Sequence, residues 1–153
     1  MTQPRLVAGI GFRHGVAADA IVALIRRALA GSAAGDGLVV IATAADRAGE
    51  PAIREAAAAF GLAPVGVAPE ALRAVDSRVP TRSARIEASR GIGSLAEAAA
   101  LAIAGGTGHL VLARIDDGRA TCALAALGPE ATIPADRRIP TTQRARAAQI
   151  ATA

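Results

Sequence analysis

Arginines beside turn-forming glycines and serines are the groups in this sequence whose types and spacing point to chemistry. A guanidinium presents a planar fork of N–H donors that matches the oxygens of a carboxylate or a phosphate. Ser83 and Ser94 each precede an expected helix, and a helix N-terminus adds free N–H groups and a positive dipole end. Together these features indicate a site for an anionic ligand. The arginines next to such turns are Arg13, Arg47, Arg82 and Arg90.

The pattern of apolar residues predicts the elements that position these groups. Two unbroken apolar runs, 6–10 and 38–42, are typical of strands covered on both faces, and residues 17–30 between them have apolar residues at helical spacing. Pro51 suits the first turn of a second helix that ends near Gly61. Further on we expect a strand at 64–67, short helices at 69–74 and 84–90, a longer helix at 95–104, and strands at 109–115 and 119–127.

The turn Asp116-Asp117-Gly118 separates the last two strands and is a strong hairpin signal. We therefore predict an α/β fold, a three-layer α/β/α sandwich. Its sheet is mixed and mostly parallel, with about five strands, the first strand central and an antiparallel hairpin at the end. The domain is expected to span residues 1–127, followed by a tail at 128–153 that is rich in proline and arginine.

Ligands of open α/β sheets bind beyond the carboxyl ends of the parallel strands, near the point where the strand order reverses. The loops 9–15 and 43–50 follow two such strands, and we expect the segments around Ser83 and Gly91–Ser94 to reach the same rim. The candidate ligand-binding residues are Gly9, Gly11, Arg13, His14, Arg47, Glu50, Ser83, Gly91, Gly93, Ser94 and Glu97.

Several candidates have a structural explanation as well as a functional one. Gly9 and Gly11 permit a turn and close packing, and Glu50 suits the start of a helix. Ser94 and Glu97 have the spacing of a capping box, in which the serine hydroxyl accepts the Glu97 N–H and the Glu97 carboxylate accepts the Ser94 N–H. The sequence leaves the choice between these explanations open.

Composition argues against several functions. A net charge of +4 and two aromatic residues give little support to nucleic-acid binding. The apolar runs are far shorter than the ~20 residues of a membrane span, and the start of the chain lacks a leader-like apolar region, so we expect no membrane and a cytoplasmic protein. One cysteine and two histidines lack metal-ligand spacing, and we predict no metal and no cofactor.

Five segments form an ordered set: Leu6–Arg13, the loop Ala42–Glu50, Thr81-Arg82-Ser83, Gly91–Leu101 and Ala120–Ala125. In this order they resemble the family of the cobalamin biosynthesis protein CobE and the C-terminal domain of CbiG. The resemblance covers about Leu6 to Leu127. The element Gly91-x-x-Ser94-x-x-Glu97 and the alanines after it are moderately specific, whereas Gly9-x-Gly11-x-Arg13 is weak alone.

The sequence departs from the family pattern at four positions. Arg47 and Arg114 stand where relatives commonly have lysine, so the charge is kept. Arg82 stands where relatives have the proline of a Thr-Pro-Ser turn, and Phe12 stands where they often have cysteine. Phe12 argues against thiol chemistry at that position.

The resemblance implies a role in building the corrin ring. In longer relatives this domain is fused to an N-terminal domain in the cobalt-precorrin-5A hydrolase, which opens a ring lactone and releases acetaldehyde. A chain of this length is expected to be the stand-alone form found with the oxygen-dependent route. Such a protein binds or processes a precorrin or hydrogenobyrinic-acid-like intermediate, with other corrin-pathway enzymes as further partners. The acetate and propionate arms of these macrocycles suit arginine forks and helix N-termini.

Three other functions stay open at this stage. One is hydrolase activity as the C-terminal part of a split enzyme, for which only Glu50 or Glu97 could serve as general base. Another is a dinucleotide-binding module, because Gly9-x-Gly11 follows a strand, although the third glycine of that fingerprint would fall at His14. The last is a scaffold that binds another enzyme and no small ligand.

Overall fold

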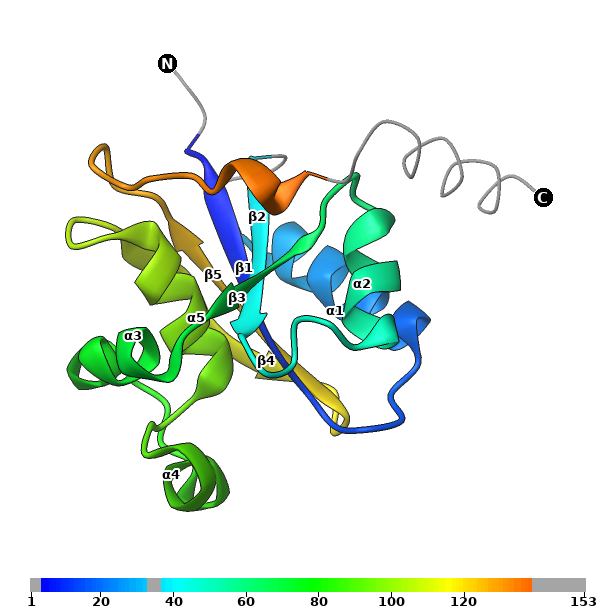
Figure 1. Ribbon diagram of the computed structural model, residues 1–153, viewed down its shortest axis with the longest axis horizontal. Helices are drawn as coiled ribbons and strands as arrows, with labels where there is room; N and C mark the ends of the chain where they lie inside the picture. Colours follow the sequence, from blue (N-terminus) through cyan, green and yellow to red (C-terminus); the bar gives the residue numbers. More distant parts are fainter. Residues whose placement is uncertain (1–3, 33–36, 139–153) are drawn as a thin grey trace.

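The computed structural model describes residues 4–32 and 37–138, which form a five-stranded sheet between two layers of helices (Figure 1). The strand order is β3-β2-β1-β5-β4. β1 pairs in parallel with β2 and antiparallel with β5, β2 pairs in parallel with β3, and β4 and β5 form an antiparallel pair. The predicted mixed sheet with a central first strand is therefore confirmed. The strands are β1 (Leu6–Phe12), β2 (Leu38–Ala44), β3 (Pro64–Val67), β4 (His109–Asp116) and β5 (Ala120–Ala126).

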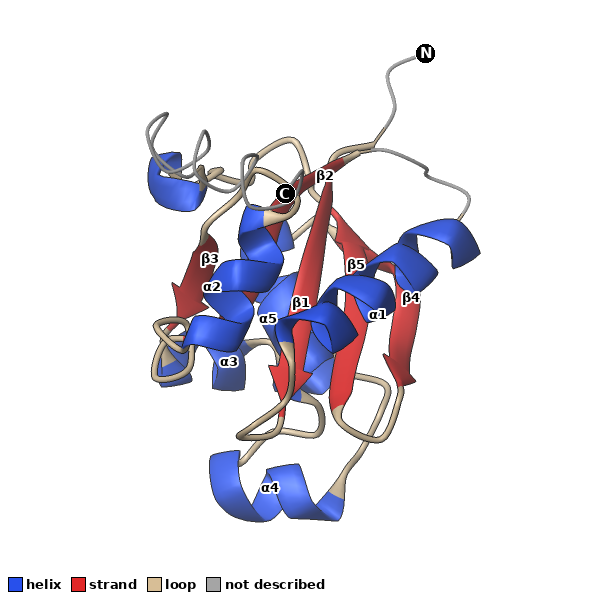
Figure 2. Ribbon diagram, turned by 90° about the vertical axis from the view of Figure 1, so that its right-hand side faces the viewer, coloured by secondary structure: helices blue, strands red, loops and turns tan. Residues whose placement is uncertain are grey.

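The helices lie on both faces of the sheet, with one exception. α1 and α2 cover one face, and α3 and α5 cover the other, whereas α4 lies beyond the strand ends (Figure 2). The helices are α1 (Ala18–Gly31), α2 (Pro51–Ala58), α3 (Pro69–Ala74), α4 (Ala84–Arg90) and α5 (Leu95–Ala104), with short 3-10 turns η1 (Asp76–Arg78) and η2 (Ala135–Arg137). No helix in the described ranges has the length and apolar character needed to cross a membrane.

β1 is buried along its whole length because it serves both cores. Its even-numbered residues, such as Ile10, pack with α1 and α2, and Val7 packs on the opposite face with α5. A Cβ at Gly9 would lie 1.9 Å from the Ala96 carbonyl oxygen. The alanine-rich helix α5 therefore approaches the sheet so closely that only glycine fits at this position.

The helix boundaries follow the predicted capping residues. The Ser83 hydroxyl accepts a hydrogen bond from the Ile86 N–H at the start of α4, and Gly91, with φ of 72°, ends it in the left-handed region. The Ser94 hydroxyl accepts the Glu97 N–H at 3.3 Å, as half of the predicted capping box. The other half is wrong, because the Glu97 carboxylate turns away from Ser94 toward Thr81 and Arg114.

Residues 128–138 pack against the domain. The Glu130 carboxylate accepts a hydrogen bond from the Thr107 N–H at 2.7 Å, Ile133 adds to the core beside α5, and the Ala63 N–H donates to the Arg137 carbonyl at 2.7 Å. The expected boundary after Leu127 stays a prediction. The rest of the predicted tail, 139–153, lies outside the described residues.

Candidate functional site

A pocket of about 780 Å³ lies at the edge of the sheet where β1, β2 and β4 end and β5 begins. From β1 the chain continues into α1 on one face of the sheet, while α5, on the other face, continues into β4. The pocket thus occupies a topological switch point, the place where open α/β sheets bind ligands. α4 lies across these strand ends and contributes a further wall (Figure 2).

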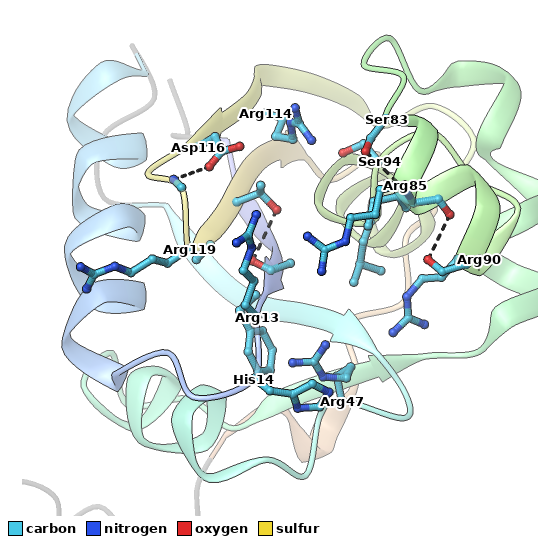
Figure 3. A pocket seen from close by; sticks show the side chains of 18 of the residues that line it. Arg13, His14, Arg47, Ser83, Arg85, Arg90, Ser94, Arg114, Asp116 and Arg119 are labelled. Atoms are coloured by element: carbon cyan, nitrogen blue, oxygen red, sulfur yellow. Dashed lines mark hydrogen bonds between the residues drawn. The ribbon is translucent and has the colours of Figure 1, made fainter.

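Arginines dominate the charged lining of this pocket, which we call the arginine pocket. Its lining contains two acidic residues, Asp46 and Asp116. Arg13 and Arg85 reach toward the middle of the pocket, whereas Arg119 extends away from it, toward α1 (Figure 3). The lining arginines are Arg13, Arg47, Arg85, Arg90, Arg114 and Arg119.

Arg90 on α4 and Asp46 after β2 form a two-pronged ion pair across the pocket. Nη1 and Nη2 of Arg90 donate to the two carboxylate oxygens of Asp46 at 3.0 and 3.2 Å. Hydrogen bonding to Arg90 holds the pKa of the Asp46 carboxyl below its ordinary value. Asp46 therefore already occupies one of the arginine forks.

Arg47 lies against an aromatic ring and a carboxylate. Its guanidinium carbon is 4.2 Å from the centroid of the Phe12 ring, and its Nε donates to the Glu50 carboxylate. The other Glu50 oxygen is 3.3 Å from Nδ1 of His14, whose side chain is largely exposed. Nη2 of Arg47 is buried and has no hydrogen-bond partner among the described residues. Phe12 and Arg47, both departures from the family pattern, are thus in contact.

Glu97 is completely buried and lies outside the lining of the pocket. One carboxylate oxygen accepts the Thr81 N–H at 2.9 Å, and the other accepts the Thr81 hydroxyl at 2.9 Å and the Arg114 N–H at 3.0 Å. The register of β4 shifts between Leu112 and Ile115. The Arg114 N–H that donates to Glu97 therefore lies within this irregular stretch of the strand. Glu97 thereby joins α5, the segment before α4, and β4.

Arg82 does not line the pocket. It donates to the Asp76 carboxylate at 2.9 and 3.1 Å and to Glu87, and Asp76 also accepts the Gly93 N–H at 2.8 Å. These bonds lower the pKa of Asp76 and raise the pKa of Arg82. A Cβ at Gly93 would lie 2.6 Å from the Thr81 carbonyl oxygen, so this glycine serves close packing. The network holds the start of α4 in place.

The predicted residues divide into two groups. One group lines the pocket: Gly11, Arg13, His14, Arg47, Ser83 and Ser94. The other group lies outside its lining: Gly9, Glu50, Gly91, Gly93 and Glu97. Within the second group, Glu50 contacts Arg47 and His14, and the Glu97 N–H donates to the Ser94 hydroxyl.

Sequence reasoning missed the contribution of α4 to the lining. Arg85, Ile86, Ser89 and Arg90 all line the pocket, and only Arg90 was considered as a ligand contact. Their spacing is the missed signal, because 85 and 89, like 86 and 90, lie four residues apart and share one helix face. That pattern predicts a polar helix face directed at one partner.

The two acidic residues of the described lining are already engaged by other groups. Asp46 is paired with Arg90, and the Asp116 carboxylate accepts the Gly118 N–H. Cys122 is buried in the core, and its burial raises the pKa of the thiol to about 12, which keeps it protonated and inert. The start of α1, where a dinucleotide pyrophosphate would bind, is also absent from the described lining of this pocket.

Fold and site together define an open α/β protein with an arginine-lined pocket at the switch point of its sheet. The chain belongs to the CobE/CbiG C-terminal family of cobalamin biosynthesis proteins. Residues 6–125 match the family model described as "Cobalamin synthesis G C-terminus". The expectation from the sequence is therefore confirmed.

Individual relatives agree with this assignment. Protein CobE from Sinorhizobium sp is 40% identical over 136 residues, which cover 88% of this chain and 86% of that protein. The crystal structure of CobE, a protein from the cobalamin (vitamin B12) biosynthetic pathway, superimposes with a TM-score of 0.76 at 34% identity, covering 84% of this chain and 96% of that one. The crystal structure of the cobalamin biosynthesis protein chiG from Agrobacterium tumefaciens str. C58 superimposes with a TM-score of 0.64 at 36% identity. The match covers 80% of this chain and 98% of that one.

Proposed function

We propose that this protein binds a corrin-ring intermediate of the precorrin or hydrogenobyrinic-acid type in the arginine pocket. The observation that carries the proposal is that six arginines, from three loops, one helix and one strand, are among the lining residues of a single pocket. The acetate and propionate arms of such a macrocycle are carboxylates at several positions around a ring. Arginines distributed around a pocket can pair with several of these arms at once.

The charges in the lining support a polyanionic ligand. The lining residues include six arginines and two acidic residues, and Arg13 and Arg85 form no ion pair with any described residue. Such an excess of one sign raises the local concentration of an oppositely charged ligand and its rate of association. The pocket volume of about 780 Å³ also falls within the range of ligand pockets, roughly 300–1,000 Å³.

Binding or transfer of the intermediate has more support than hydrolysis. A hydrolase needs a general base within reach of an attacking water. Glu97 is buried with three hydrogen bonds to its carboxylate, and Glu50 is engaged by Arg47 and His14. Corrin-pathway enzymes that deliver or receive the macrocycle are the partners that this role requires, and a cytoplasmic location goes with it.

Replacement of pocket arginines tests the proposal. Hydrogenobyrinic acid titrated into Arg13→Ala and Arg114→Ala should bind roughly five- to fiftyfold more weakly than to the wild type, because each change removes a charge-assisted hydrogen bond. Arg27→Ala, at an exposed position of α1 outside the pocket, is the matched control and should bind as the wild type does. Equal affinity in all four proteins would show that the macrocycle does not use this pocket.

A further inference from the structure

We infer that Arg47 is the fixed anchor of the arginine pocket, with the Nη side of its guanidinium donating to one carboxylate of the ligand and so setting the ligand's orientation. The inference rests on the proposed binding of a carboxylate-bearing macrocycle. It adds that the pocket arginines are not equivalent. Arg47 is held through Nε by Glu50 while its Nη side still lacks a partner among the described residues, whereas both Nη atoms of Arg90 are already paired with Asp46.

Three sets of contacts fix Arg47 before any ligand arrives. The Phe12 ring lies under the guanidinium, with 4.2 Å between its centroid and the guanidinium carbon. Glu50 accepts from Nε, which sets the rotation of the guanidinium about its long axis. The backbone is held as well, because the Arg47 N–H donates to the Ala44 carbonyl at 2.9 Å and the Glu50 N–H donates to the Arg47 carbonyl at 3.2 Å. A donor fixed in this way loses little side-chain entropy when a ligand binds.

The Nη side of Arg47 is the part left without a partner. Nη2 is buried and donates to no described residue, and Nη1 has no hydrogen-bond partner among them either. Buried polar groups are nearly always paired, and a charged donor left unpaired is costly. The residue itself lines the pocket. A ligand carboxylate that accepts a hydrogen bond from this side of the guanidinium would supply the missing charge-assisted partner.

Arg90, Arg13 and Arg85 differ from Arg47 in burial or in pairing. The Arg47 side chain is 14% exposed, and the 21% exposed Arg90 side chain is already paired with Asp46. Arg13 and Arg85 are exposed and form no ion pair with any described residue, so they contribute charge without a fixed direction. Among these described residues, preorganisation and an unfilled donor side therefore coincide at Arg47.

Charge-conserving replacements test this inference separately from the general electrostatics. Arg47→Lys keeps the positive charge but loses the planar fork and its stacking on Phe12, so hydrogenobyrinic acid should bind at least fivefold more weakly. Arg13→Lys, at an exposed lining arginine, should change the affinity less than threefold, because a lysine supplies the same point charge there. Circular dichroism induced in the visible bands of the bound corrinoid reports orientation, and at saturation it should change in Arg47→Lys and persist in Arg13→Lys.

A double-mutant cycle with Phe12 tests the geometry. Phe12→Leu keeps an apolar side chain in the core but removes the ring under the guanidinium. It should weaken binding about threefold or more when Arg47 is present and have no effect in the Arg47→Lys background. Thermal unfolding followed by circular dichroism establishes that each variant is folded at the titration temperature.

The outcomes separate the two proposals. If wild-type protein shows no saturable binding of hydrogenobyrinic acid, the proposed function itself is wrong. If the wild type binds and Arg47→Lys binds with the same affinity and the same induced dichroism, the function stands and Arg47 is not the anchor. Equal effects of Arg47→Lys and Arg13→Lys would likewise overturn the inference, because they would mean that only charge matters.

Discussion

Arg90 and Asp46 lie 44 residues apart in the sequence, and their side chains join the end of α4 to the loop that follows β2. None of the residues of α4 is buried, and Ile86 is its one half-buried apolar side chain in contact with the core beside α5. The position of this helix over the pocket therefore depends on polar contacts at its two ends. One end is held by the Asp76–Arg82–Glu87 network and the other by Asp46.

Asp46→Asn should loosen α4 without unfolding the domain. Exposed ion pairs are worth about 0.2–1 kcal/mol, so the amides of α4 should exchange with solvent deuterium roughly two- to fivefold faster at pH 7. The pKa of Asp46 lies below its ordinary 3.8, so the pair is intact at neutral pH and is lost only as the pH falls through the lowered pKa. Asp19→Asn on α1 is the control. Unchanged exchange in Asp46→Asn would mean that other contacts hold α4.

Glu97→Gln should destabilise the fold through a single atom. The amide keeps the shape of the side chain but places an NH₂ donor where an oxygen now accepts from Thr81 and Arg114. Leaving a buried donor unpaired costs about 1–3 kcal/mol, and each kcal/mol lowers the Tm of a domain of this size by roughly 2–4 °C. Calorimetry should find that decrease in Glu97→Gln and almost none in the exposed Glu87→Gln. A Tm equal to that of the wild type would contradict the assigned role of Glu97.

Gly9→Ala tests whether the first glycine serves packing. The added Cβ would lie 1.9 Å from the Ala96 carbonyl oxygen and 2.8 Å from the Ala100 nitrogen, so α5 must move away from β1. Overpacking of this kind costs about 1–3 kcal/mol or more, and urea should unfold the variant at a clearly lower concentration. Gly49→Ala, where a Cβ meets nothing within 4 Å, should leave the midpoint unchanged. Equal midpoints for the two variants would refute the packing explanation.

Cys122 gives the protein a distinctive stability profile at high pH. Burial raises the pKa of its thiol from 9.0 to about 12, so above pH 9 the unfolded chain loses this proton while the folded chain keeps it. Stability should therefore fall by roughly 1.4 kcal/mol per pH unit above pH 9. The chain has no lysine and no tyrosine, so no other side chain titrates between about pH 9 and 12. Chemical denaturation across this range should show this fall in stability with pH in the wild type and no such fall in Cys122→Ala. The same fall in both proteins would contradict the raised pKa assigned to Cys122.

The local elements could be predicted because their signals are local. Ser83 and Ser94 cap their helices, Pro51 and Pro69 begin theirs, and the Asp-Gly turn joins β4 to β5. Each of these signals depends only on residues that are close to it in the sequence. The same reasoning predicted which loops meet at the carboxyl edge of the sheet, because that follows from strand direction.

Contacts between distant segments could not be predicted in this way. Glu97 has the spacing of a capping box, but Thr81 and Arg114 compete for its carboxylate, and their proximity depends on the tertiary fold. Arg82 was expected at the pocket and instead pairs with Asp76 and Glu87. For Glu97, donors 16 and 17 residues away displaced the bond that the capping-box spacing predicts, and for Arg82 two nearby carboxylates displaced the expected contact with a ligand.

The most direct test of the account is a visible-absorbance titration of the purified protein with hydrogenobyrinic acid, with NADPH titrated in parallel. The chain contains no tryptophan or tyrosine, so the protein adds little background in the near ultraviolet, where NADPH absorbs. The account predicts a saturable shift of the corrinoid bands that weakens as salt is raised, and no binding of NADPH. Saturable binding of NADPH alone would support a dinucleotide-binding module, and no binding of either compound would point to a protein-binding scaffold; both results contradict the central claim.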